Sequence, residues 1–396
     1  TARHTWQQIL LDHPDFEWLK APQTNIEVSD PTSQLTGHFL RVPFLGNGAL
    51  PKGLSEDDFP KREDGSRYLP FFLTASRLHM LGLLRQNTAK YLDGGRQKLH
   101  IAPAGPQGVG KSMYCYLIAT YAAVNQFPLI YIPLVTEWAL KPSTGLMAQF
   151  FIKQFVALNK HWFPSNCTFY DDLQQLSLSQ RTVSTPVLYE EAFRLQDILL
   201  ESLDLGFDGV PKTIPSFTVI DEHNELFRSA RGEVPMVEQE PRYFRPFWNW
   251  TLGGVTVLCG SAHSKFLSSM PGGTTQSIVE LQPFSRDETV TYLMSKESPD
   301  SFGGLTTDQA HQIAEVYGGI PRILSGLKGV VESRLQSGQY SNLEGALASV
   351  PYNAIQAQFE LQKRFDRYCS ERVDPTAEAR AAFIKVVESC MLTKAF

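Results

Sequence analysis

Short apolar runs alternate with longer, helically spaced segments through the middle of the chain. The apolar runs predict strands at Leu99–Ala102, Pro128–Pro133, Ser216–Asp221, Gly254–Ser261 and Ser277–Leu281. Helical spacing between them predicts helices at Ser112–Asn125, Leu146–Asn159 and Glu190–Asp204, with a polar segment over 164–185. Strands that alternate with helices pair in parallel through right-handed crossovers. The pattern therefore predicts an α/β fold, with a parallel five-stranded sheet flanked by helices.

The segments before and after this alternation have a different pattern. Residues 1–70 are rich in Pro, Gly and Asp, and they predict an N-terminal extension or small subdomain with a short strand in GHFLRVP. An amphipathic helix is predicted within 73–92, where Leu78, Leu81, Leu84 and Tyr91 have helical spacing. It opens the core domain, which we expect over 71–284.

After Phe284 the pattern becomes helical. Helices are predicted over 285–294, which opens with a Ser/Asp capping signal, over 306–317 and over 322–335. Two glycines, Gly318 and Gly319, end the second of them. We expect a helical lid over 285–350 and a C-terminal helical tail over 351–396, with further helices near 352–372 and 376–391.

Composition narrows the class of protein without fixing its function. The chain has 396 residues, too many for one ordinary core, and a formal net charge of −5, so no global charge attracts nucleic acid or an anionic membrane. Direct nucleic-acid contact through a local basic patch stays open. No apolar run is long enough to span a membrane. Because the chain begins at Thr1 rather than Met, we expect a processed or trimmed protein.

The cysteines bear on the compartment. They are five in number, scattered and without a CxxC pair: Cys115, Cys167, Cys259, Cys369 and Cys390. This distribution argues against a disulfide framework and against a zinc site of paired cysteines. It favours an intracellular, reducing compartment, with mitochondrial matrix, nucleus and cytoplasm all open.

The strongest chemical signal follows the first predicted strand of the core. GPQGVGKS has the spacing of a phosphate-binding loop, with a strand before it and a helix after it. Glycines permit a tight turn whose amides face phosphate oxygens, and the helix N-terminus adds a favourable dipole. Lys111 is expected to reach the β- and γ-phosphates and Ser112 to bind Mg²⁺. The candidate nucleotide-binding residues are Gly105, Pro106, Gln107, Gly108, Val109, Gly110, Lys111, Ser112 and Met113.

A second candidate site ends the apolar strand in FTVIDEHNELF. Asp221 is expected to hold Mg²⁺ together with Ser112, and Glu222 to act as the general base that activates water. His223 and Asn224 either orient water or cap the following turn. An Asp-Glu turn after a buried strand also occurs without catalysis, and the upstream phosphate loop favours the catalytic interpretation.

Two further residues are candidates for contact with the γ-phosphate. Ser261 follows the strand in LCGSAHS, which we expect beside the Asp-Glu strand. Arg322 lies on the first turn of a predicted helix in YGGIPRIL, where Pro321 begins the helix. A guanidinium there could sense the γ-phosphate, whereas a solvent-facing Arg at a plain helix corner is the alternative.

These motifs, in this order, resemble the signal-transducing, AAA-like branch of P-loop NTPases. Within that branch, GPQGVGKS, LIYIPLVTEWA, IDEHNELF, GSAHS and LTTDQAHQIAEVYGGIPRIL are similar to blocks of the crinkler and retrotransposon-hot-spot NTPase family, over about Phe71 to Leu335. That family often has Gln at the second acidic position, so Glu222 favours a hydrolytic site. Its C-terminal effector domain would not fit within 376–396.

A second resemblance is to the mitochondrial small-subunit ribosomal GTPase-like family, also called the death-associated protein family. It rests on the phosphate loop, the YIP…W segment, Asp221 to Asn224, the Ser-rich strand end and AQFFIKQFVALNKHWF.

The two resemblances imply different functions. The first implies an NTPase whose lid switches with the nucleotide, and the second a ribosomal subunit that holds a purine nucleotide mainly as a structural ligand. A nucleic-acid-directed effector is a third hypothesis. ATP is favoured over GTP because no Asn-Lys-x-Asp guanine block is present, and a protein or ribonucleoprotein assembly is the expected partner.

Overall fold

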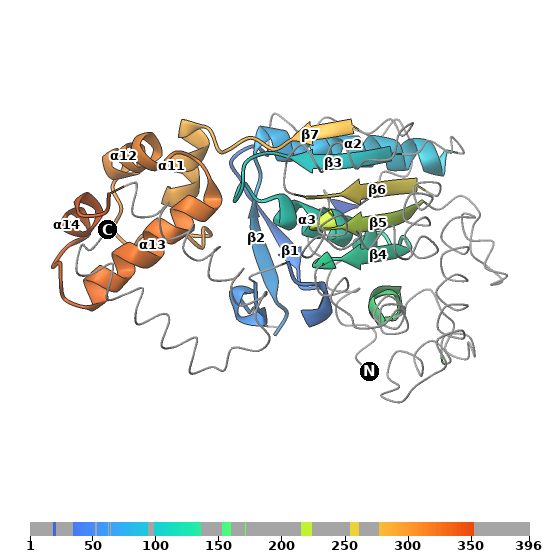
Figure 1. Ribbon diagram of the computed structural model, residues 1–396, viewed down its shortest axis with the longest axis horizontal. Coiled ribbons are helices and arrows are strands. Elements are labelled where there is room, and N and C mark those ends of the chain that lie inside the picture. The colour runs from blue at the N-terminus through green and yellow to red at the C-terminus, as the bar shows by residue number, and fades with distance from the viewer. Residues whose placement is uncertain are drawn as a thin grey trace, which may run out of the picture.

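A sheet of parallel strands forms the centre of the structure, a computed structural model (Figure 1). The structure describes residues 19–20, 35–51, 54–61, 63, 65–93, 99–135, 153–159, 171, 215–223, 254–260 and 277–351. The strands are β3 (Leu99–Ala104), β4 (Leu129–Ile132), β5 (Ser216–Ile220), β6 (Gly254–Leu258) and β7 (Ser277–Glu280). Their order is β4-β5-β6-β3-β7, with every neighbouring pair parallel. The predicted five-stranded parallel sheet is thus confirmed, and β6 lies between the strand before the phosphate loop and the Asp-Glu strand.

The two middle strands are the most apolar part of the sheet. Every residue of β5 and β6 is buried. Helix α3 (Lys111–Val124) packs against β4 and β5 and buries every residue from Tyr114 to Val124. Helix α2 (Ala75–Leu92) contributes Leu78, Leu81 and Leu84 to the same core. These contacts fix the start of α3, and with it the phosphate loop, at the carboxyl end of the sheet.

A two-stranded antiparallel sheet precedes this core. It pairs β1 (Phe39–Pro43), which the sequence predicts, with β2 (Tyr68–Phe72), which it does not. Pro70 interrupts the apolar run of β2, and proline within a run argues against a strand. A two-stranded sheet tolerates it, because each strand needs hydrogen-bond donors on one side alone. Short 3₁₀ helices, η4 (Asn47–Ala49) and η5 (Glu56–Asp58), lie between the two strands.

Within the described residues, four helices follow β7 and form a second apolar core. They are α11 (Arg286–Met294), α12 (Thr307–Tyr317), α13 (Pro321–Gln336) and α14 (Leu343–Ala348), and α14 is absent from the sequence prediction. Capping boxes at Ser285 and Thr306 begin the first two. Phe72 of β2 joins this second core, next to Phe284 and Tyr292. In Figure 1 the arrowheads of the parallel sheet, β3 to β7, point toward these helices.

Several predicted elements fall wholly or partly outside the described residues. Residues 153–159 are helical, as expected for the end of the helix at Leu146–Asn159, while 190–204 and the tail helices lie outside. The domain boundaries at 70, 284 and 350 stay predictions. Within the described residues, no helix combines the length and the apolar character that a membrane span requires.

Candidate functional site

The phosphate loop turns sharply between β3 and α3. Gly105, Gly108 and Gly110 have φ angles of 137°, 84° and 103°, which L side chains rarely adopt. Space is also limiting, because a Cβ on Gly105 would lie 2.5 Å from the carbonyl oxygen of Leu281. All three glycines are therefore required by the loop. Pro106 and Gln107 form its exposed tip, and the Val109 side chain is buried in the core.

Lys111 and Ser112 begin the helix that the loop leads into. The Lys111 ammonium folds back on the loop, where Nζ donates to the carbonyl oxygens of Gly105 (2.9 Å) and Pro106 (3.0 Å). Burial lowers the pKa of Lys111, and Asp221 is among the groups that oppose this. The amine is thus placed beside the acidic strand end, within a turn built to receive an anion. Met113 is half-buried and packs against the core.

Asp221 lies directly after β5, only 2% exposed. Its backbone N–H donates to the carbonyl oxygen of Ile132 (2.9 Å), which fixes it between two strands. Burial raises the pKa of this carboxyl, whereas the nearby Ser112 hydroxyl and Cys259 thiol lower it. Among the described residues, Oδ2 makes no hydrogen bond of regular geometry. A buried carboxylate oxygen without a hydrogen bond of regular geometry, beside a serine hydroxyl, fits a Mg²⁺ site of the phosphate-loop type.

Glu222 and His223 continue the chain in an unusual conformation. Glu222 has a φ of 55°, and its N–H donates to Asp221 Oδ1 (2.9 Å). A left-handed non-glycine residue costs on the order of 1 kcal/mol and is concentrated at functional sites. The N–H of His223 donates to the carbonyl oxygen of Cys259 (2.7 Å), which ties this turn to the end of β6. His223 is fully buried, and burial lowers its pKa to about 3, so its ring is neutral.

Arg322 lies against the phosphate loop from the helical side. Its backbone N–H donates to the carbonyl oxygen of Gly108 (3.3 Å), and a Cβ on Gly108 would lie 2.7 Å from the Cβ of Arg322. The guanidinium is on the exposed side of α13, close enough to lower the pKa of Lys111. The corner before it is equally close-packed, since a Cβ on Gly319 would overlap the carbonyl oxygen of Phe284. The backbone of Arg322 is thus bonded to the phosphate loop, while its side chain is exposed, and its role as a γ-phosphate sensor stays a prediction.

Arg77 is a site residue that the sequence prediction missed. It is buried on α2, where Nη1 donates to the carbonyl oxygen of Phe72 (2.6 Å) and Nη2 to that of Val109 (3.3 Å). Its guanidinium also lies over the rings of Phe71 (4.8 Å to the centroid) and Phe284 (5.0 Å). Burial lowers its pKa from 12.5 to about 10. The signal was available, because helical spacing places Arg77 on the same face as Leu78 and Leu81.

The structure therefore brings together most of the predicted site. The loop, Lys111, Ser112, Asp221, Glu222 and Arg322 converge at the carboxyl end of the sheet. Ser261 and Asn224 lie outside the described residues. The parallel sheet and the glycine-rich strand–loop–helix unit constitute the fold of a P-loop NTPase.

Comparison with known proteins finds matches among solved structures. No protein-family model matches the sequence, and no curated protein matches it. Among solved structures, the Walker-type ATPase of Pyrococcus abyssi is similar at 19% identity, with a TM-score of 0.39, over 72% of this chain and 77% of that one. At this TM-score the likeness adds nothing to the geometry above.

Proposed function

We propose that this chain binds a purine nucleoside triphosphate with Mg²⁺ and hydrolyses it, with ATP as the favoured nucleotide. The observation that carries the proposal is the convergence of Lys111, Ser112 and Asp221 at the turn between β3 and α3. A half-buried cation, a hydroxyl and a buried carboxylate are the groups that a metal–triphosphate requires.

Each residue would have a defined task. The loop amides and Lys111 would bind the phosphate oxygens, and Lys111 would exchange its bonds to the loop carbonyls for bonds to phosphate. Ser112 and Asp221 would hold Mg²⁺, which neutralises negative charge on the phosphates when it is bound. Glu222 would accept a proton from the attacking water, held in place by its N–H bond to Asp221.

The helical unit would respond to the nucleotide through Arg322. Because the Arg322 backbone is bonded to the loop residue Gly108, a change in the loop on binding would be passed to the start of α13. The guanidinium would then contact the γ-phosphate and release it after hydrolysis. The backbone bond between Arg322 and Gly108 supports the crinkler-like hypothesis of a nucleotide-operated lid, since the resemblance to that family includes the same Gly-Gly-Ile-Pro-Arg corner.

The experiment that tests hydrolysis compares wild type with Glu222→Gln in a phosphate-release assay with Mg²⁺-ATP and Mg²⁺-GTP. We expect the variant to bind nucleotide as wild type does and to turn over about 10²–10⁴-fold more slowly, the usual contribution of a general base. The exposed Glu315, which pairs with Arg286 at 2.5 Å, supplies the control Glu315→Gln, which should leave turnover unchanged.

Equal turnover in wild type and Glu222→Gln would refute the hydrolytic role. Binding without turnover in wild type would favour the ribosomal hypothesis, in which the nucleotide is a structural ligand. That hypothesis has its own test, because the native protein would then co-sediment with mitochondrial small ribosomal subunits.

A further inference from the structure

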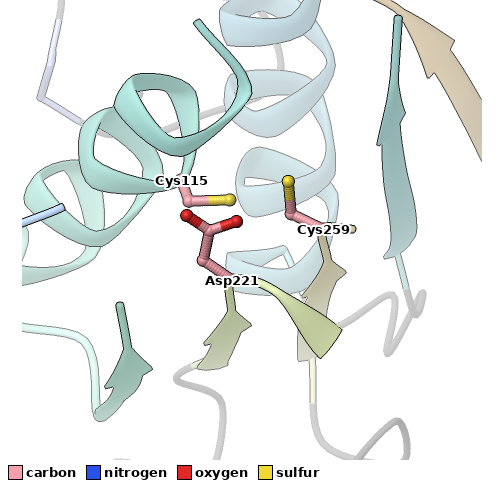
Figure 2. Close-up of side chains that lie close together, drawn as sticks. All are labelled: Cys115, Asp221 and Cys259. Atoms are coloured by element: carbon pink, nitrogen blue, oxygen red, sulfur yellow. The ribbon is translucent and has the colours of Figure 1, made fainter. Parts of the chain in front are cut away.

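Two cysteines that lie far apart in the sequence meet at the carboxylate beneath the phosphate loop. Cys115 is on α3, one turn after Lys111 and Ser112, and Cys259 directly follows β6. Figure 2 shows both sulfur atoms beside the carboxylate of Asp221, which lies at the end of β5. The two Sγ atoms and a carboxylate oxygen all lie within 4.8 Å of one another. The sequence spacing of the cysteines gave no sign of this cluster.

Hydrogen bonds between strands fix the backbone of Asp221 and of Cys259, and Cys115 lies within helix α3. Asp221 is bonded to β4 through Ile132, and Cys259 donates its N–H to the carbonyl oxygen of Ile220 (2.9 Å). The carbonyl oxygen of Cys259 accepts from His223 (2.7 Å). Cys115 and Cys259 are free, buried thiols. A ligand set held on three elements of the core needs little reorganisation to bind an ion.

We propose that Cys115, Cys259 and Asp221 form a binding site for a thiophilic divalent cation of the Zn²⁺ class. Tetrahedral Zn²⁺ with bonds of about 2.3 Å to sulfur places two sulfurs about 3.8 Å apart. Because the ligand atoms lie within 4.8 Å of one another, they need to close in by no more than about 1 Å, which small side-chain rotations provide. The donor set of two sulfurs and one oxygen selects Zn²⁺ or Cd²⁺ over Mg²⁺ and Ca²⁺.

A second observation points to a ligand at this place. Asp221 is 2% exposed, and its Oδ2 has no regular hydrogen bond within the described part of the chain. A buried carboxylate oxygen without a hydrogen bond of regular geometry carries a desolvation cost that a bound cation reduces. The Tyr131 hydroxyl, also buried without a hydrogen bond among the described residues, lies close enough for electrostatic interaction with both cysteines and Asp221.

The charges balance when the ion is bound. Each thiol gives up its proton to solvent as a metal–sulfur bond forms, so two thiolates, one carboxylate and a divalent cation sum to one negative charge. Lys111 interacts electrostatically with all three ligand residues and supplies the compensating positive charge.

The site has a consequence for the proposed function, on which this part of the inference rests. Asp221 cannot bind Zn²⁺ with the cysteines and Mg²⁺ with Ser112 at the same time. Occupation by the thiophilic ion would therefore inhibit binding of Mg²⁺-nucleotide. Thiol oxidation or loss of either cysteine would remove this inhibition without removing Asp221.

The test is a titration of the reduced protein with Cd²⁺ and Co²⁺ in the absence of nucleotide. The parent protein has Cys167, Cys369 and Cys390 replaced by Ser, which leaves Cys115 and Cys259 as the two thiols. We expect one ion per chain and a thiolate-to-metal charge-transfer band. Cys259→Ser should abolish this band and weaken binding by more than about 100-fold, beyond the effect of a lost outer-shell partner. Asp221→Asn should weaken binding and keep a sulfur-derived band.

Absence of the band in the parent, or a band unchanged by Cys259→Ser, would overturn the proposal. X-ray absorption of the Zn²⁺-loaded parent needs no further substitution, so it decides the question even if the single variants fail to fold. We expect two sulfur neighbours and at least one oxygen, and the absence of sulfur would refute the site.

A second arm separates this proposal from the proposed function. Zn²⁺-loaded parent should lose binding of Mg²⁺-ATP, and retained binding would refute the competition. If the metal-free protein binds no nucleotide, the proposed function is wrong, and the cation site stands or falls by the titration alone.

Discussion

Replacement of Arg77 by Met tests whether a buried guanidinium holds the phosphate loop in its binding conformation. The two hydrogen bonds of Arg77 join β2 to the loop through the carbonyl oxygens of Phe72 and Val109. Gly110 lies close to the same guanidinium, since a Cβ at this position would lie 2.8 Å from Arg77 Nη2. Met fills much of the volume but cannot donate to either carbonyl.

The expected change in stability follows from opposing contributions. Hydrogen bonds from a charged donor contribute about 1.5–3 kcal/mol each, and desolvated cation–π contacts about 2 kcal/mol. Against these, the lowering of the Arg77 pKa from 12.5 to about 10 corresponds to about 3 kcal/mol, which Met does not incur. We therefore expect Arg77→Met to lower the free energy of unfolding by at least about 2 kcal/mol.

Nucleotide binding should fall as well, because the loop would no longer be held before the ligand arrives. We expect ATP affinity to fall by at least about tenfold, which corresponds to about 1.4 kcal/mol. Arg77→Lys keeps a positive charge, but a lysine ammonium lacks the two separated nitrogens that donate to the two carbonyl oxygens. This variant should therefore restore ATP affinity only in part. Urea unfolding measures the stability change, and calorimetric titration with Mg²⁺-ATP measures affinity.

Arg85 supplies the matched control, because it is also buried on α2 but bonds to the carbonyl oxygen of Lys20, away from the loop. Arg85→Met should destabilise the protein and leave ATP affinity unchanged. Equal ATP affinity in wild type and Arg77→Met would refute the role of Arg77, whatever its effect on stability.

Two further predictions concern Arg322 and the buried histidine. Arg322→Ala should slow ATP turnover while the fold is kept. The control is Arg286→Ala, which removes an exposed ion pair of the same helical unit and should leave turnover unchanged. Equal phosphate release by the two variants would exclude Arg322 as a γ-phosphate sensor. Burial lowers the pKa of His223 from 6.5 to about 3, so between these values the unfolded chain binds a proton that the native chain does not, and stability falls as pH falls. In metal-free protein we expect the free energy of unfolding to fall by about 2 kcal/mol more between pH 7 and pH 5 in wild type than in His223→Leu. Urea unfolding at both pH values measures this difference, and an equal fall in the two proteins would show that the reasoning is wrong.

The sequence predicted the sheet because the pattern of its strands is local. β5 and β6 are short apolar runs whose residues are all buried, as expected for interior parallel strands. The loop was equally readable, since three glycines, Lys111 and Ser112 are contiguous. β2 was missed because Pro70 interrupts its apolar run, and its pairing with β1 depends on a partner distant in the sequence.

The unpredicted parts of the site depend on tertiary contacts. Arg77 has no motif around it, and its role follows from the approach of α2 to the loop. Cys115 and Cys259 meet because β6 lies next to β5 and α3 packs against β5, an arrangement that the spacing of the cysteines cannot indicate. Local pattern thus identified the contiguous motif, whereas the sheet order determined which distant side chains surround it.

The central claim is that the turn between β3 and α3 binds a nucleoside triphosphate. Calorimetric titration of Mg²⁺-ATP into wild type and Lys111→Ala tests it most directly, with Lys90→Ala, an exposed lysine of α2, as the control. We predict one ATP per chain in wild type and in Lys90→Ala, and no detectable binding in a folded Lys111→Ala, because the cation that faces the phosphates is gone. ATP affinity unchanged by Lys111→Ala would contradict the account.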